Sequence, residues 1–239
     1  MKAGKTLGLI PAKGGSTRLA KKNVRLLGGK PLIAWAADAA RDSGVIDRLI
    51  LSTEDEAVAE TARALSIDVP FMRPPELARD PAGVVEVALH ALDALEEAND
   101  RYDTLIIMLP TCPFRTAGDI RGAFELFVQK DRPFLMSVAE YTHTPFSAYR
   151  LDGADGLEPV FPEYLDRRSQ TMPKAFRPNG AVHVLDVPRF RAARDYVAQP
   201  LVGYVMPRER SIDIDTDADL REASFLLSER AAAPEQPVT

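Results

Sequence analysis

The sequence predicts an α/β fold built around a mainly parallel sheet. Short apolar runs alternate with segments whose apolar residues recur at helical spacing, which is typical of βαβ units. The chain has 239 residues, of which 46% are hydrophobic, so it can bury one large core and at most a small appendage in addition. Two independent domains are not expected.

The alternating elements follow one another along the first 140 residues. Strands are expected at the short apolar runs, and Pro31 and Asp119 stand near plausible helix starts. The predicted strands are residues 6–12, 48–52, 103–109 and 134–139. The predicted helices are residues 31–42, 54–65, 83–98 and 118–130. Right-handed crossovers would place these helices on both faces of the sheet.

The alternation breaks between about residues 140 and 178, where aromatic residues, prolines and charges are mixed without a clear period. An irregular stretch of this length inside a compact domain is usually functional. Regular structure is expected to return with strands at residues 180–187 and 201–206 and a last helix at 218–228. The tail at 231–239 has little to bury and is expected to be disordered.

Composition excludes several classes of function. The net charge of −5 argues against a nucleic-acid partner, because binding to a phosphate backbone needs a basic face. Cys112 is the only cysteine, so neither an intramolecular disulfide nor a cysteine-based zinc site is expected, which fits a reducing compartment. No apolar stretch approaches the roughly 20 residues that cross a bilayer, and no signal-peptide core follows the first residues. We expect a cytoplasmic protein without a membrane partner.

A flexible turn with cations and small hydroxyls follows the first predicted strand. Residues 10–23 read I-P-A-K-G-G-S-T-R-L-A-K-K-N. Gly14 and Gly15 fall at the carboxyl end of the strand, where open α/β sheets bind ligands and backbone N–H groups can approach phosphate oxygens. The spacing is neither that of a P-loop nor that of a dinucleotide fold. The turn therefore indicates a nucleoside triphosphate site, with a plain solvated surface turn as the alternative.

The turn, followed by G-K-P-L at 29–32, resembles the opening of the acylneuraminate cytidylyltransferases, which join CTP to sialic-acid-like sugars and release pyrophosphate. Further blocks of that family appear in order, and together they span about residues 6 to 229. The resemblance implies a Rossmann-like, mainly parallel sheet of the nucleotide-diphospho-sugar transferase type, in a single domain at 1–230. It also implies that residues 140–178 form a dimerisation arm that reaches into the partner's active site, so a homodimer with arm exchange is expected.

For the triphosphate, the resemblance implies contacts from the turn and the segment after it. The implied CTP-binding residues here are Ala12, Lys13, Gly14, Ser16, Lys22 and Asn23. Lys13, Lys22 and Asp213 are the implied catalytic residues. The family usually has arginine at Lys13 and lysine at Thr17, so this chain has one cation fewer, for which Arg18 or Lys21 could compensate.

For a metal, residues 211–216 read S-I-D-I-D-T. Asp213 and Asp215 are two apart, so in extended backbone their carboxylates point the same way, and hard oxygen ligands suit Mg²⁺. The alternative is an acidic cap of the next helix, a role that Thr216 or Asp217 can also fill. The resemblance implies that Asp213 and Asp215 bind the metal.

For the base, residues 73–80 read R-P-P-E-L-A-R-D and resemble a family block whose first arginine lies in the cytosine pocket. Arg73 could donate to O2 of cytosine. The alternative is a surface loop in which Arg73 only pairs with an acid. Gly83 stands where the family often has a serine that helps to read the base, so backbone atoms would have to take over that contact.

For the sugar acid, residues 109–116, 167–173 and 176–181 resemble sequence blocks of the family. The implied sugar-binding residues are Leu109, Thr111, Arg115, His143, Arg168, Gln170, Asn179 and Gly180. Leu109 replaces a glutamine that contacts sialic acid in the family, and a role as the last core residue of its strand is the alternative. Ser169 replaces an arginine, which leaves the sugar's identity open. His90 is expected to be packed or on the surface, His183 lies on a predicted strand, and Cys112 is expected to be a small buried residue.

The blocks together predict a CMP-sugar synthetase for a nonulosonic acid, with CTP and a sugar acid as substrates. One alternative keeps the fold and activates another 3-deoxy sugar acid, such as an octulosonate, or uses another nucleotide. An alternative of a different class is a non-catalytic nucleotide-binding protein, which the departures at Thr17, Gly83, Leu109 and Ser169 motivate.

Overall fold

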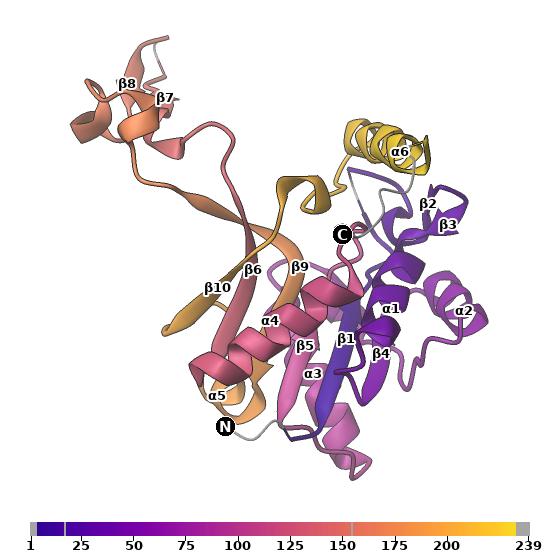
Figure 1. Ribbon diagram of the computed structural model, residues 1–239. Helices are drawn as coiled ribbons and strands as arrows, with labels where there is room; N and C mark the ends of the chain where they lie inside the picture. The colour runs from indigo at the N-terminus through magenta and orange to yellow at the C-terminus, as the bar shows by residue number, and fades with distance from the viewer. Residues whose placement is uncertain (1–3, 17, 154, 233–239) are drawn as a thin grey trace, which may run out of the picture.

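The fold is a six-stranded mixed sheet with helices on both faces (Figure 1). The computed structural model describes residues 4–16, 18–153 and 155–232. The strands lie in the order β10-β6-β9-β5-β1-β4, and only β9 runs antiparallel to its neighbours, which confirms the predicted mainly parallel sheet. Their bounds are β1 Thr6–Pro11, β4 Arg48–Ser52, β5 Thr104–Ile107, β6 Phe134–Glu140, β9 Phe176–Asp186 and β10 Leu201–Val205.

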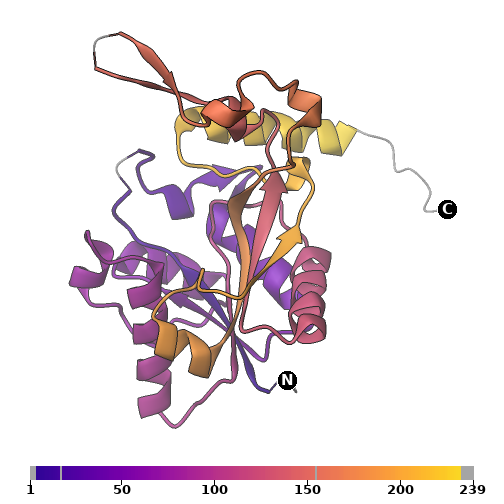
Figure 2. The same cartoon turned by 90° about the vertical axis from the view of Figure 1, so that its left-hand side faces the viewer.

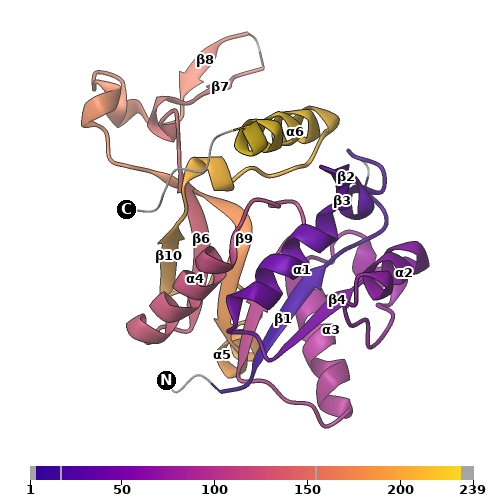
Figure 3. The same cartoon turned by 45° about the vertical axis from the view of Figure 1, so that its right-hand side comes forward.

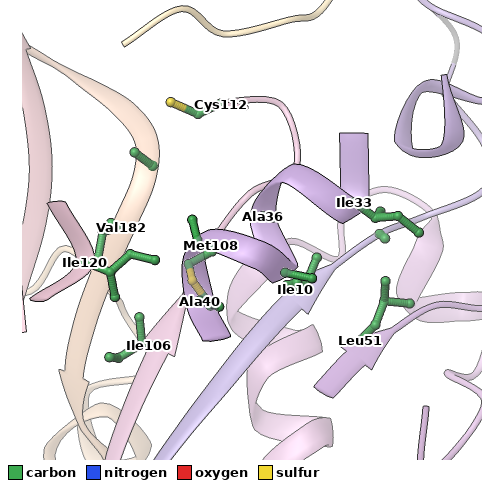
Figure 4. Close-up of a cluster of buried hydrophobic side chains, with 14 of the residues drawn as sticks. Ile10, Ile33, Ala36, Ala40, Leu51, Ile106, Met108, Cys112, Ile120 and Val182 are labelled. Carbon is green, nitrogen blue, oxygen red and sulfur yellow. The ribbon is translucent and has the colours of Figure 1, made fainter. Parts of the chain in front are cut away.

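The central strands are buried on both sides because two layers of helices cover them. On one face, α1 (Leu32–Ser43) and α4 (Ala117–Lys130) pack on an aliphatic cluster that includes Ile10, Ile106 and Ile120 (Figure 4). On the other face, α3 (Val84–Glu97) and α5 (Val187–Ala193) pack on a second cluster, with Phe190 fully buried. Continuous apolar strands such as T-L-G-L-I-P at β1 require this two-sided cover.

A third cluster lies beyond the carboxyl end of the sheet. It joins α6 (Asp217–Ala232) to β2 (Leu26–Leu27), which pairs with β3 (Lys30–Pro31). Figure 3 shows α6 close to this strand pair. Outside residues 140–178, the remaining helices of the described chain are α2 Glu56–Ala64 and the 3-10 turns Lys22–Val24, Pro75–Ala78 and Arg208–Arg210. No helix among the described residues is long and apolar enough to cross a membrane.

Most predicted boundaries hold within two residues, and three features differ more. Strand β9 begins four residues early, because Phe176 already pairs with Glu140 on β6. Helix α5 was not expected, since seven residues are too few to show a helical period. Helix α6 continues to Ala232, two residues into the expected tail, and residues 233–239 lie outside the described part of the chain.

The irregular segment forms an arm that projects away from the sheet (Figures 1 and 2). It contains a hairpin of β7 (Tyr149–Leu151) and β8 (Leu157–Pro159) and the 3-10 turns Pro145–Ser147, Pro162–Tyr164 and Ser169–Thr171. A small aromatic cluster holds it, with Phe146 stacked on Tyr164 at 4.6 Å between ring centroids. Large apolar side chains of the arm stay exposed, Leu151 by 70%.

Candidate active site

A pocket of about 210 Å³ opens at the carboxyl ends of β1 and β5. Seven residues predicted to bind CTP or sugar line it: Lys13, Lys22, Asn23, Arg73, Gly83, Leu109 and Thr111. The rest of its wall is mostly apolar and comes from the segment before α3 and the first turn of that helix: Leu77, Ala78, Ala82, Val84 and Val87. The structure thus gathers residues separated by up to 98 positions in the sequence into one concave site.

The glycine turn is held from two sides. The backbone N–H of Gly14 donates to Glu54 Oε1 at 2.8 Å, and Asn23 Nδ2 donates to the backbone oxygen of Lys13 at 2.7 Å. Asn23 is buried, whereas the Lys13 side chain is exposed and lines the pocket. Ala12 has its methyl group in the core, so its backbone is all that it can offer a nucleotide. These two hydrogen bonds anchor the turn, unlike a plain solvated loop. Thr17, where the family usually has a lysine, lies outside the described residues.

Arg73 lies buried in the wall of the pocket, with 4% of its surface exposed. Its backbone N–H donates to Thr53 O at 2.8 Å and its guanidinium pairs with Glu54. Burial alone would raise the pKa of Glu54, but hydrogen bonds from Arg73 and from backbone N–H groups outweigh it and hold that pKa below its usual value. Arg73 therefore does pair with an acid, but within the pocket and not on a surface loop.

Gly83 precedes α3 at the rim of the same pocket. Its backbone N–H is already taken, since it donates to Glu86 Oε2 at 2.8 Å. The backbone oxygen of Gly83 is likewise engaged by Val87 within the helix. A base contact at Gly83 would therefore have to compete with the first turn of α3.

The acidic pair, Asp213 and Asp215, lies beside cations that are predicted to neutralise the triphosphate. Lys22 Nζ contacts Asp215 Oδ1 at 2.7 Å, and Arg18 contacts the other oxygen of Asp215 at 2.8 Å. Asp213 is exposed by surface area, but the surrounding protein partly desolvates its carboxyl group, and the charge of Asp215 acts in the same direction, so its pKa is raised. Helix α6 is capped by Thr216, whose hydroxyl accepts from Asp219 N at 3.3 Å, so neither Asp213 nor Asp215 is needed as the cap.

The two carboxylates of Asp213 and Asp215 make a donor set that suits a hard divalent cation. The described residues contain no group of three or more histidine, cysteine or acidic side chains placed to hold a metal. A cation at Asp213 and Asp215 would therefore take its other ligands from water and from a bound nucleotide. That ligand set is the one that Mg²⁺ commonly uses with phosphates.

The loop after β5 is fixed from within. Arg115 is 3% exposed and donates to the backbone oxygens of Leu109, Cys112 and Ala181. Asn179 is 1% exposed and spans Ser137 and Ser211 with its amide. Arg115 and Asn179, which are predicted to bind the sugar, therefore have protein partners for their polar groups and hold the segments that follow β5 and form β9.

The cytidylyltransferase family profile matches residues 7–153. Over 93% of this chain and 96% of the relative, the sequence is 31% identical to pseudaminic acid cytidylyltransferase of Campylobacter jejuni. The chain belongs to the cytidylyltransferase family. The predicted resemblance and an enzyme of this transferase class are thereby confirmed.

Other relatives are named for related sugar acids. The chain is 29% identical to CMP-N,N'-diacetyllegionaminic acid synthase of Legionella pneumophila, over 94% of this chain and 98% of the relative. It is 28% identical to N-acylneuraminate cytidylyltransferase of Escherichia coli, over 92% of this chain and 51% of that relative. CMP:2-keto-3-deoxy-manno-octonic acid synthetase complexed with CTP shares the fold, with a TM-score of 0.71 at 15% identity over 95% of this chain and all of that one.

The predicted sugar residues of this cytidylyltransferase fall into two places. Leu109 and Thr111 line the main pocket. Leu109 also lies against Gly180, where a Cβ atom would come within 2.9 Å of Leu109 Cδ1 and a φ of +68° disfavours any side chain. On the arm, His143 and Gln170 line a separate cavity of about 330 Å³. Arg168 is exposed on the arm. A single chain therefore does not bring its predicted sugar residues together.

The expected burial of Cys112 is confirmed, His183 is also buried, and His90 is half-buried. Burial raises the pKa of Cys112 to about 11, so its thiol is neutral and not a nucleophile. His183 is 5% exposed, and burial together with Arg115 lowers its pKa to about 4. His90 packs edge-on against Phe71 at 5.1 Å.

Glu54 is the site residue that sequence reasoning missed. It follows β4, and the pairing of Pro11 with Ser52 places the ends of β1 and β4 side by side. The signal for Glu54 is an acid that directly follows a strand next to β1, and so lies near the glycine turn. Reading this signal requires the order of the strands in the sheet, which could not be told from the sequence.

Proposed function

We propose that the protein transfers the cytidylyl group of CTP to the anomeric hydroxyl of a nonulosonic acid. A bond forms between the sugar oxygen and the α-phosphorus, the bond from that phosphorus to the β-phosphate oxygen breaks, and pyrophosphate leaves with the hydroxyl proton lost to solvent. The observation that carries the proposal is one pocket that joins buried Arg73 to Lys13, Asn23 and Lys22, with Asp215 of the acidic pair in contact with Lys22.

The residues present suit a reaction that depends on positioning and charge. Lys13 and Lys22 would neutralise the triphosphate, and Asn23 keeps the turn closed through Lys13 O. Asp213 and Asp215 would hold Mg²⁺, which when bound supplies further charge neutralisation at the phosphates. Arg73 would meet the base at the inner wall of the pocket.

The choice of a nonulosonic acid rests on the names of the relatives and on the residues of the pocket. Pseudaminic, legionaminic and N-acylneuraminic acids, which these relatives are named for, are all sugar acids of one class. Leu109 presents an apolar side chain to the pocket, where the resemblance implies a glutamine in sialic-acid enzymes. This departure favours a nonulosonic acid other than common sialic acid.

We further propose a cytoplasmic homodimer in which the arm completes the partner's sugar site. The arm leaves large apolar side chains in solvent, including Leu157 at 65% exposure and Tyr149 at 53%. Exposed apolar patches of this kind mark interaction surfaces. The cavity that holds His143 and Gln170 is carried on the same arm, so exchange would move it to another subunit.

Pyrophosphate release tests the proposal across the four nucleoside triphosphates and a panel of pseudaminic, legionaminic, sialic and 3-deoxy octulosonic acids, with and without Mg²⁺. CTP with a nonulosonic acid is expected to react, and chelation of Mg²⁺ is expected to stop the reaction. Preference for the octulosonic acid or for another nucleotide would establish the rival that keeps the fold. CTP binding without turnover on any sugar would establish a non-catalytic protein.

Matched variants test the acidic pair. Asp213→Asn and Asp215→Asn are expected to lose activity by about 100-fold or more, because the charge that holds Mg²⁺ is halved. Asp217→Asn serves as the control, since Asp217 is exposed and pairs with Arg25 at 3.2 Å. Equal losses in all three variants would contradict the assignment.

A further inference from the structure

Glu54 connects two parts of the pocket that the chain supplies separately. Strands β1 and β4 run parallel and end together, with Ala12 N donating to Ser52 O at 2.9 Å. The residues that follow β4 therefore lie against the glycine turn that follows β1. This placement brings the Glu54 carboxylate within reach of both the turn and Arg73.

Each oxygen of the Glu54 carboxylate has its own partner. Oε1 accepts the backbone N–H of Gly14 at 2.8 Å, and Oε2 pairs with Nη2 of Arg73. The side chains of Glu54 and Arg73 are only 14% and 3% exposed, so water screens this ion pair little. The Glu54 carboxylate thus holds both the Gly14 N–H of the glycine turn and the Arg73 guanidinium in the wall of the pocket.

Arg73 keeps donor capacity for a ligand. Its Nε is buried and has no hydrogen-bond partner among the described residues, although the side chain lines the pocket. A guanidinium is planar and its donors are fixed relative to one another, so holding Nη2 restricts where the others can point. An unsatisfied buried donor in a pocket wall indicates an acceptor supplied by the ligand.

Cytosine and uracil differ in what a fixed guanidinium can meet. Cytosine offers two adjacent acceptors, O2 and N3, whereas N3 of uracil carries a hydrogen. A site whose donors are held in place rejects a base that lacks the matching acceptor, but a mobile guanidinium can turn to tolerate it.

We propose that Glu54 is a positioning residue for nucleotide selection, which orients Arg73 toward cytosine while it holds the Gly14 amide for the triphosphate. This inference rests on the proposed function, since it assumes that CTP occupies this pocket. Glu54 itself touches neither base nor phosphate in this role.

The test is the ratio of kcat/KM for CTP to that for UTP in wild type and in Glu54→Gln. Glutamine keeps the shape and an acceptor for Gly14, but it removes the charge that holds Arg73. We expect the ratio to fall at least tenfold, mainly through a higher KM for CTP. Glu56→Gln is the control, because Glu56 is exposed and pairs with Arg63 on the surface of α2; its ratio is expected to stay unchanged.

A mutant cycle separates positioning from general damage. In an Arg73→Lys background, Glu54→Gln is expected to change the ratio less than twofold, because the group that it positions is gone. If Glu54→Gln does not fold, Glu54→Asp takes its place, since the shorter side chain cannot hold both partners. A ratio within twofold of wild type in the folded variant, or an equal fall in both backgrounds, would overturn the inference. A wild-type protein that does not use CTP would instead overturn the proposed function.

Discussion

Gly14→Ala is the substitution whose effect the structure defines most sharply. A Cβ atom at Gly14 would lie 2.4 Å from Asp55 Cβ and 2.2 Å from Asp55 Oδ2, whereas ordinary contacts begin at 3.4 Å. The turn and Asp55 must therefore separate by about 1 Å, which is the difference between the contact limit and the Cβ distance. Asp55 cannot yield freely, because its side chain caps α2 through Val58 N at 3.1 Å.

Two measurable losses follow from that displacement. A shift of about 1 Å in the phosphate turn is expected to lower kcat/KM for CTP by roughly 100-fold. Weakening the Asp55 cap is expected to cost about 1 kcal/mol of the free energy of unfolding, and so to lower Tm by about 2–4 °C. Pyrophosphate release and thermal unfolding measure the two effects.

Gly15→Ala is the matched control. A Cβ atom at Gly15 meets nothing within 4 Å in the part of the chain that the structure describes, and the residue does not need a left-handed conformation. We expect its activity to stay within threefold of wild type. Activity of Gly14→Ala within threefold of wild type, or an equal loss in Gly15→Ala, would refute the steric reasoning.

Three further predictions concern the support of the site, its pH dependence and its specificity. Arg210→Gln should lower the free energy of unfolding by about 2 kcal/mol in urea titrations, against little change for exposed Arg208→Gln, because Asp119 is 1% exposed and loses a two-pronged partner. The depressed pKa of His183, about 4, means that the unfolded state binds the extra proton as pH falls below about 6.5; wild type should lose about 2 kcal/mol of stability between pH 7 and pH 5 that His183→Leu does not lose. Leu109→Gln should shift sugar preference toward N-acetylneuraminic acid by about tenfold in kcat/KM, and an unchanged preference would place Leu109 outside sugar selection.

Much of the fold was predictable because the spacing of apolar residues along an element indicates which of its residues are buried. The strands at β1 and β4 and the helices at α1 and α3 have enough residues to show their period. Helix α5 was not predicted, because its seven residues, V-P-R-F-R-A-A, span too few turns to show a helical spacing of apolar residues. The early start of β9 depends on pairing with β6, which is a contact between distant segments.

The site was predictable where a residue's type and its place after a strand agree. Lys13, Lys22 and Arg73 do line one pocket. The burial of Arg115 and Asn179 against protein partners was not predicted, because a sequence does not tell whether a polar group faces a ligand or an inner polar group of the protein. Glu54 was missed because its partner Gly14 is 40 residues away and the two meet only through the pairing of β1 with β4.

The fate of the α-phosphorus of CTP tests the central claim most directly. The protein would be incubated with Mg²⁺, a nonulosonic acid and CTP labelled at either the α- or the γ-phosphorus, and the products separated. We predict that the α-label moves into a CMP-sugar while the γ-label appears in pyrophosphate in equal amount. An α-label that stays in CTP, or that appears as free CMP without a sugar adduct across the whole panel, would contradict the account.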